Sequence, residues 1–358
     1  MNKLHRLWLL PLCALMATGC TPRQELSEMT LPIMTACNLN EEQMELTILS
    51  FSPGEDDQQP PQVTTFSGVT LSEKLQTQGS AAGGWAAGLS SLLLVGQPLA
   101  EQGVLDSLDL FLRDPRIRSS QPVALTQGDP AEFLQALADS EGGNGGELTE
   151  RYDDTMRQSA YASNTLYRFI RESTGPGGNS FLPILDVDDQ GRLQFVGTGL
   201  FHQGVLVETL SAEEAWQLHL LRQSGVSGIV PFTCQGINAS AYVKGRRSVK
   251  VDRDEQGRLV FTLQLRLQAS LMELDQPITQ QEPSDEALST AIDEALYARL
   301  RALTDRLQAS GIDGYDLTDI AVARYGASLG DPSNPEWFRQ ATVNLALSTQ
   351  ITGRGQLQ

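Results

Sequence analysis

The sequence contains few of the residues that most often bind metals. Its 358 residues include four cysteines and three histidines; the cysteines form no CxxC pair, and His5, His202 and His219 do not cluster. A zinc-type site needs several such ligands at short spacings. We therefore expect no metal centre and no cofactor, and we expect His219 to be a packed residue of a helix that Ser211 caps.

Positive charge is also scarce. Lys and Arg together number 26 against 44 Asp and Glu, which gives a formal net charge of -18. An acidic field of this size repels nucleic acid and anionic lipid headgroups. We therefore expect no nucleic-acid partner, and any attachment to a membrane would have to come from a covalently bound lipid alone.

No segment after residue 20 is long and apolar enough to cross a bilayer; the best candidate, GLSSLLLVG at 88–96, has the length of a core strand. The start of the chain is different, because Lys3 and Arg6 precede a short apolar run that ends in Ala17-Thr18-Gly19. A charged start, an apolar middle and a small-residue exit predict a secretory signal peptide over residues 1–19.

The residue after this exit is Cys20. Small residues directly before a cysteine are typical of a bacterial lipoprotein box, in which the thiol receives a diacylglycerol and the chain is cut before the cysteine. Two acyl chains are enough for stable anchoring. The alternative is an ordinary signal peptide cut after Ala17 or Gly19, which would leave a free secreted protein. We favour the lipoprotein, because a cysteine at this place has no other role in a plain exit.

Two further cysteines, Cys37 and Cys234, remain in the exported chain. Export permits a disulfide between them. Cysteine is also among the most frequently buried residue types, even when it is not bonded. The sequence leaves both alternatives open: one disulfide, or two buried free thiols.

Motifs for catalysis and nucleotide binding are missing or incomplete. The sequence has no GxSxG, and GTGLFHQG at 197–204 has His202 where a dinucleotide-binding loop needs its third glycine. DVDDQG at 186–191 resembles the opening of a calcium loop, but its twelfth position is Gly197 in place of glutamate. We expect a β-turn there, and we expect the protein not to be an enzyme.

The first part of the exported chain mixes strand and helix patterns. Ser67 or Thr70 is expected to cap a short helix. The glycine-rich segment at 139–148 has no GK[ST] and is expected to be a loop that breaks this region. Apolar runs and helical spacings predict strands at 41–51, 89–96 and 121–128, a helix within 97–118 that Asp114-Pro115 ends, and a helix that begins at 130–139.

The last third has the clearest patterns. Residues 259–271 alternate strictly between apolar and polar side chains, which predicts a long antiparallel strand with one buried and one solvent-exposed face. A helix with an apolar stripe is expected between a Ser284 cap and a Gly311 stop, followed by a strand over 341–355. We therefore expect a multi-domain α+β protein with mixed or antiparallel sheets flanked by helices, divided into regions 20–195 and 196–358.

Several segments resemble one known family in the same order along the chain. They are CTPRQELSEMTLP after the signal, LDLFLRDPRIRSSQPVALTQGDPAEFL at 108–134, FVGTGLFHQGVLVETLSAEEA at 195–215, and LQASGIDGYDLTDIAVARY with TQITGRG near the end. The chain resembles the GerAC-like lipoproteins, the C subunits of nutrient germinant receptors in spore-forming bacteria.

This resemblance implies a lipoprotein on the outer face of the spore inner membrane. It would act with two integral membrane subunits, A and B, in a receptor that senses small nutrients, and the family's C subunit has no established catalysis. The alternative is a solute-binding lipoprotein, which should present a deep cleft with convergent polar and aromatic groups. Neither hypothesis identifies the germinant.

A basic island stands out within this acidic chain. FLRDPRIR places Arg113, Arg116 and Arg118 within a few residues of one another. One interpretation is that these arginines pair with acidic side chains around a helix end. The alternative hypothesis is that they contact a partner subunit.

Overall fold

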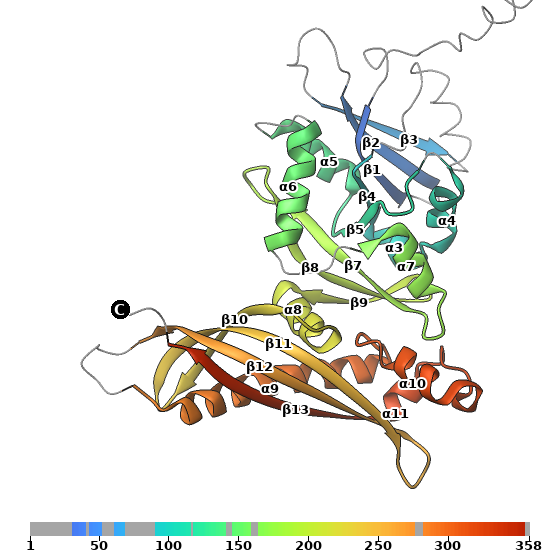
Figure 1. Ribbon diagram of the computed structural model, residues 1–358. Helices are drawn as coiled ribbons and strands as arrows, with labels where there is room; N and C mark the ends of the chain where they lie inside the picture. Colours follow the sequence, from blue (N-terminus) through green and yellow to red (C-terminus); the bar gives the residue numbers. More distant parts are fainter. Residues whose placement is uncertain are drawn as a thin grey trace, which may run out of the picture.

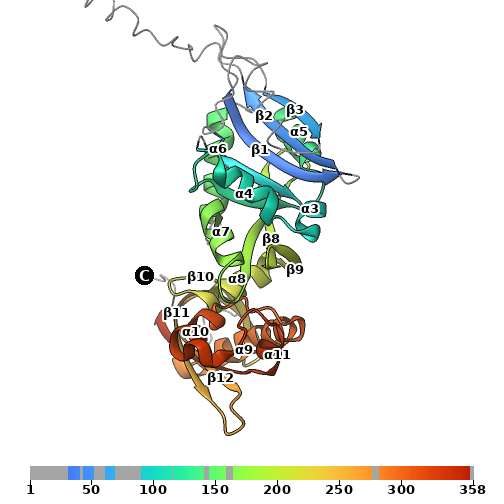
Figure 2. The same ribbon diagram turned by 90° about the vertical axis from the view of Figure 1, so that its right-hand side faces the viewer.

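The computed structural model describes residues 31–40, 43–51, 61–68, 90–115, 117–140, 145–158, 164–275 and 282–354. Two domains are stacked along the long axis of the molecule, and each is built on its own β-sheet (Figure 1, Figure 2). The predicted multi-domain α+β fold is confirmed.

The first domain is built on a nine-stranded mixed sheet in the order β3-β2-β1-β4-β5-β7-β8-β9, with the short β6 beside β5. Its centre is parallel, from β1 through β4 and β5 to β7, and its two sides are antiparallel. The strands are β1 (Leu31–Asn40), β2 (Gln43–Phe51), β3 (Gln62–Gly68), β4 (Leu92–Gly96), β5 (Pro122–Thr126), β6 (Asn164–Thr165), β7 (Asn179–Val187), β8 (Leu193–His202) and β9 (Val205–Ser211).

Helices cover both faces of this sheet, so its central strands are apolar on both sides. In β4, Leu93 and Val95 face one apolar cluster while Leu92 and Leu94 face the other. The first cluster includes side chains of α3 (Gln97–Gln102), α4 (Leu105–Arg113) and α7 (Leu166–Ser173), and the second includes side chains of α5 (Pro130–Asp139) and α6 (Gly145–Gln158).

The second domain contains a four-stranded sheet in the order β10-β11-β12-β13. The first three strands form an antiparallel meander, and β13 returns parallel to β12. Its elements are α8 (Ala212–Arg222), β10 (Ser227–Cys234), β11 (Ile237–Arg253), β12 (Leu259–Leu274), α9 (Asp285–Ser310), α10 (Leu317–Tyr325), a 3-10 turn (Gly326–Leu329), α11 (Glu336–Gln340) and β13 (Thr342–Gly353).

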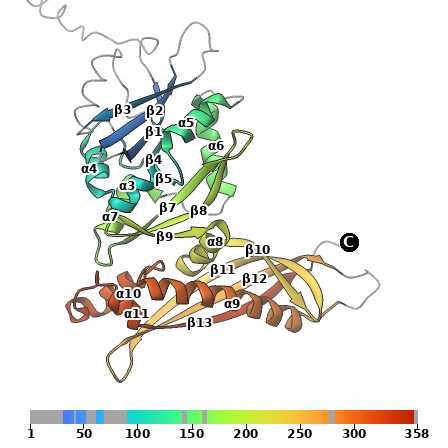
Figure 3. The ribbon, with the colours of Figure 1, turned by 180° about the vertical axis from the view of Figure 1, so that it is seen from behind.

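The long helix α9 lies along one face of this sheet (Figure 3). Ser284 caps its start by accepting a hydrogen bond from the backbone N–H of Ala287, and Gly311 ends it with a positive φ of 78°. The predicted apolar stripe is buried against the alternating inner side chains of β12. The predictions of this helix and of the two long strands are confirmed.

Other expectations of local structure need correction. Ser67 lies in β3 and caps no helix, because Ser67 pairs with Glu45 of β2. The alternative cap, Thr70, lies outside the described residues. The single helix expected over 97–118 is two helices, since Gly103 ends the first with a φ of 122°. The loop expected over 139–148 was placed too far along the chain, because helix α6 already begins at Gly145.

The turn expected at DVDDQG is confirmed, because it joins β7 to β8 and Asp188 accepts hydrogen bonds from the backbone N–H groups of Gln190 and Arg192. The domain division expected at residue 195 falls inside β8. This strand and β9 still belong to the first sheet, which continues to Ser211. The sheet of the first domain therefore extends past the boundary that the sequence suggested.

Candidate functional site at the domain junction

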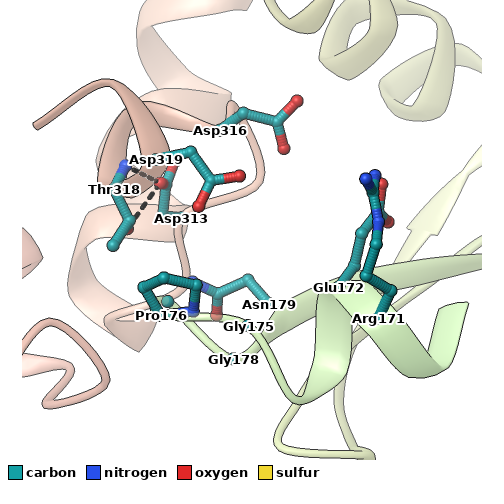
Figure 4. Close-up of a pocket in the computed structure, with 11 residues that line it drawn as sticks. Arg171, Glu172, Gly175, Pro176, Gly178, Asn179, Asp313, Asp316, Thr318 and Asp319 are labelled. Atoms are coloured by element: carbon teal, nitrogen blue, oxygen red, sulfur yellow. Dashed lines mark hydrogen bonds between the residues drawn. The ribbon is translucent and has the colours of Figure 1, made fainter. Parts of the chain in front are cut away.

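A small polar cleft lies where the two domains meet, with a volume of about 230 Å³. The turn between α7 and β7, residues 175–178, forms one side, and the segment between α9 and α10 forms the other (Figure 4). Four carboxylates line it: Glu172 from the first domain and Asp313, Asp316 and Asp319 from the second. The cleft is therefore a predominantly acidic junction.

The second-domain side of the cleft is held in shape by Asp313. Its buried carboxylate accepts hydrogen bonds from the backbone N–H groups of Tyr315 at 3.0 Å and Thr318 at 2.6 Å, and from the Thr318 hydroxyl at 2.8 Å. Within this loop Asp316 takes a left-handed backbone conformation with a φ of 59°, which is uncommon outside glycine. The loop is thus fixed so that the Asp316 side chain points toward α8.

Arg222, the last residue of α8, joins the two domains. Its buried guanidinium lies 2.8 Å from Asp316 and 3.3 Å from Glu172 of α7. The same guanidinium stacks over the ring of Phe181 in β7, 4.5 Å from the centroid. One cation therefore contacts a helix and a strand of the first domain and the α9–α10 loop of the second.

A second arginine, Arg247, holds the backbone near Arg222 and Asp316 in place. Arg247 of β11 donates hydrogen bonds to the carbonyl oxygens of Arg222 at 2.7 Å and Tyr315 at 2.6 Å. It ties the end of α8 to the residue before Asp316. Burial lowers the pKa of Arg247, while Asp316 and Asp313 oppose that shift.

The junction also has a perturbed electrostatic environment. Burial raises the pKa of Asp316 to about 6, although the neighbouring Arg222 acts in the opposite direction. The pKa of Asp319 is raised as well, first by burial and then by Asp313 and Glu172. The chemistry that this site offers is hydrogen bonding and proton uptake near neutral pH.

His219 lies one turn before Arg222 on α8. It is buried, as the sequence predicted, and packs edge-on against Phe181 with ring centroids 5.2 Å apart. Burial, helped by Arg222 and Arg168, lowers the pKa of His219 to about 3. The ring is therefore neutral and part of the apolar contact between α8 and the first sheet.

The structure separates the residues that the sequence singled out. Cys20 and Arg116 lie outside the described residues. Arg113 ends α4 and pairs with Asp109 four residues earlier, while Arg118 is exposed in the segment before β5. None of the described members of this set reaches the domain junction.

The two remaining cysteines are not bonded to each other. Cys37 is buried in β1 of the first domain and Cys234 is buried at the end of β10 in the second, and both are free thiols. The disulfide alternative is therefore wrong for this structure, because the cysteines belong to different sheets. The alternative of two buried thiols is confirmed.

Sequence reasoning missed the junction residues. Glu172, Arg222 and Asp316 are separated by long stretches of chain, so their proximity follows only from the tertiary structure. Two local signals were present: Asp316 lies in the segment LQASGIDGYDLTDIAVARY that resembles the family, and the capping box at Ser211 and Glu214 fixes where α8 begins.

Comparison with known proteins accounts for most of the chain. A family model described as spore germination protein N-terminal domain matches residues 22–187, and one described as spore germination B3/GerAC like, C-terminal, matches residues 196–355. No curated protein matches the chain. A solved structure titled "Crystal Structure of the GerBC protein" has a similar fold with a TM-score of 0.60 and 18% identity, covering 92% of this chain and 99% of that chain. The chain therefore belongs to the GerAC-like family of spore germination proteins.

Proposed function

We propose that this protein is the lipid-anchored C subunit of a nutrient germinant receptor. It acts beside two membrane subunits, A and B, on the outer face of the spore inner membrane, and it contributes to assembly and signalling without catalysis. The observation that carries this proposal is the match of both halves of the chain to the domains of one spore germination family.

The anchoring part of the proposal rests on the start of the sequence. Residues 1–19 have the pattern of a signal peptide, and Cys20 follows small residues as in a lipoprotein box. A diacylglycerol on Cys20, with a further acyl group on the new amino terminus, would hold the chain stably at a bilayer. Among the described residues, no helix is both long and apolar enough to cross a membrane.

The non-catalytic role is supported by what lines the junction. Three of its four carboxylates are engaged: Glu172 and Asp316 with Arg222, and Asp313 with backbone N–H groups of its own loop. Its volume of about 230 Å³ is below the range of about 300 to 1,000 Å³ typical of small-molecule pockets. A rigid link between two domains fits this geometry better than the capture of a solute.

Affinity purification from spore inner membranes tests the proposal. The parent protein and a Cys20→Ala variant are recovered in parallel, and the co-purifying proteins are identified by mass spectrometry. We expect the two membrane subunits with the parent protein and their loss or reduction with the variant. Mass spectrometry of the amino-terminal peptide should also show the lipid on Cys20. Recovery of the parent protein alone, with a small molecule bound, would favour a solute-binding lipoprotein instead.

A further inference from the structure

Among the described residues, the helices cover one face of the four-stranded sheet of the second domain. On the inner face, Leu220 of α8 packs against Gly245 and Leu267, and α9 buries its apolar stripe. Figure 1 shows β10 to β13 in front of α9, and Figure 3, seen from behind, shows α9 in front of the strands. No described helix lies on the outer face of this sheet.

The outer face collects positive charge. Lys244, Arg246 and Lys250 of β11 and Arg266 of β12 alternate with buried residues and are all exposed. Between Tyr242 and Lys250 and on the facing parts of β12 and β13, the outward side chains include no Asp or Glu. We name these four cations and their neighbours the basic sheet face.

Two of these cations oppose each other directly. Arg246 of β11 is the register partner of Arg266 of β12. Like charges directly opposite on neighbouring strands destabilise a sheet. Within the described residues neither arginine forms an ion pair, whereas most other arginines of the second domain do. An anion placed on this pair would relieve the repulsion.

The side chains around the pair are neutral and polar. Gln268 lies opposite Lys244, Thr262 lies opposite Lys250, and Ser348 of β13 lies beside Arg266. These groups can donate hydrogen bonds to phosphate oxygens as readily as they bind water. The basic sheet face therefore offers many hydrogen-bond donors over a broad surface.

One end of the face carries exposed apolar side chains. Ile229 of β10 is the register partner of Tyr242 of β11, and their exposed fractions are 57% and 45%. Tyrosine beside an aliphatic residue is typical of surfaces that sit at the level of lipid headgroups, because the ring is apolar and the hydroxyl is polar. Cations and amphipathic side chains thus share one broad surface.

We propose that the basic sheet face binds the anionic lipid headgroups of a bilayer. The cations are spread along two strands, which suits a plane of many phosphates better than a single acidic side chain or peptide. From its net charge alone, the protein was expected to be repelled by anionic lipid headgroups. At physiological salt, however, the field of a surface charge decays within about 8 Å, so the local charge of a face matters more than the sum. The acidic residues elsewhere therefore do not cancel a face that is locally basic.

The proposal builds on the proposed function in one respect, since the lipid on Cys20 is what brings this face to a bilayer. Each Lys or Arg near an anionic membrane strengthens binding by about fivefold. Four such residues give weak attachment alone, and they add to an acyl anchor that already holds the chain at the bilayer. The face would then fix how the tethered protein lies on the membrane.

The test uses the chain from residue 20 onward with Cys20→Ala, so that no anchor contributes. Sedimentation is measured with vesicles of phosphatidylglycerol mixed with phosphatidylcholine and with phosphatidylcholine alone, at low ionic strength and at about 0.5 M salt. We expect binding to the anionic vesicles only, and its loss at high salt. The double variant Arg246→Gln, Arg266→Gln should bind about 25-fold more weakly, fivefold for each cation removed.

A matched control removes the same charge elsewhere. Arg192→Gln with Arg258→Gln alters two exposed arginines that already pair with Asp188 and Asp254 in hairpin turns, and binding should stay at the parent level. Equal binding by both double variants, or no binding to anionic vesicles at low salt, overturns the proposal. If vesicle binding is absent but the Arg246 and Arg266 variant loses membrane subunits in affinity purification, the face binds an acidic protein surface instead. The anchoring experiment is separate, so either proposal can fail without the other.

Discussion

The guanidinium of Arg222 lies 2.8 Å from the carboxylate of Asp316 and is almost completely buried. Both residues belong to the second domain, but Arg222 ends α8 and also contacts Glu172 and Phe181 of the first domain. The pair is therefore part of the contact that sets the orientation of the two domains. The same arginine also contacts Glu172, so removing it leaves Asp316 without this cation, while Glu172 keeps its pair with Arg168 of α7.

Replacing Arg222 should destabilise the protein. Breaking a buried ion pair by removing one partner costs about 3 to 5 kcal/mol, because the remaining charge stays buried. Because Asp316 is partly exposed and Glu172 keeps Arg168, we expect Arg222→Met to lower the free energy of unfolding by less than that, about 1 to 3 kcal/mol, in urea denaturation. Arg192→Met, at an exposed pair, should change it by less than about 1 kcal/mol. Similar effects of the two substitutions would show that Arg222 does not hold the junction.

The stability that Asp316 contributes should fall as pH rises. Its pKa in the folded protein is about 6 against an ordinary value of 3.8, so between these values the folded state binds more protons than the unfolded state. Stability therefore decreases through this window as pH increases. Asp316→Asn cannot ionise, and we expect the difference in unfolding free energy between variant and parent to shift in favour of the variant as pH rises from about 4 to 7.

Unfolding curves of both proteins across this range measure that difference. The comparison cancels the titration of the other carboxylates, including Asp188 and Asp254, whose pKa values are lowered and which favour the folded state at higher pH. A difference that does not change with pH would mean that Asp316 titrates normally.

The packing of the two domains should be sensitive to Gly177. A Cβ atom at this position would lie about 3.0 Å from the side chain of Thr318 across the cleft. We expect Gly177→Leu to push the domains apart and to lower the thermal midpoint. Gly128→Leu serves as the control, because a Cβ atom at that position would have no neighbour within 4 Å. Small-angle scattering that shows the same dimensions for the parent and the Gly177 variant would contradict the expected separation.

The two described thiols should be inaccessible in the folded protein. Burial raises the pKa of Cys37 to about 12, and burial also raises that of Cys234. Since the thiolate is the reactive form, we expect almost no labelling by a maleimide reagent under native conditions and labelling of both cysteines in denaturant without reductant. A need for reductant before labelling would indicate the disulfide that the structure lacks.

The partner-contact hypothesis for Arg113, Arg116 and Arg118 remains a prediction. Arg118 is exposed and Arg113 is engaged with Asp109, so charge reversal at Arg116 and Arg118 is the cleaner test. We expect it to reduce co-purification of the membrane subunits while the thermal midpoint stays unchanged. Unaltered recovery of both subunits with normal folding would remove the hypothesis.

Much of the local structure could be read from the sequence, because it depends on neighbours in the chain. The alternation in 259–271 and the stripe between Ser284 and Gly311 each encode one buried face. The strands β10 and β11 were not predicted, although β11 alternates between buried and more exposed residues from Ala239 to Arg246. Three of its inward residues are Ala239, Ala241 and Gly245, which give a weak apolar signal. Helix 97–118 was placed correctly but not divided, because a single glycine gives a weak signal.

The sequence by itself determined the kind of protein this is: a multi-domain α+β chain with segments that identify its family. Those properties depend on short-range patterns. Only the tertiary structure decided which charges meet. Domain docking brings Glu172, Arg222 and Asp316 together, and strand register places Arg246 opposite Arg266 on a basic face that the net charge of -18 conceals. Net charge is a sum over residues, whereas electrostatic interactions decay over a few ångströms, so position in the fold decides what each charge does.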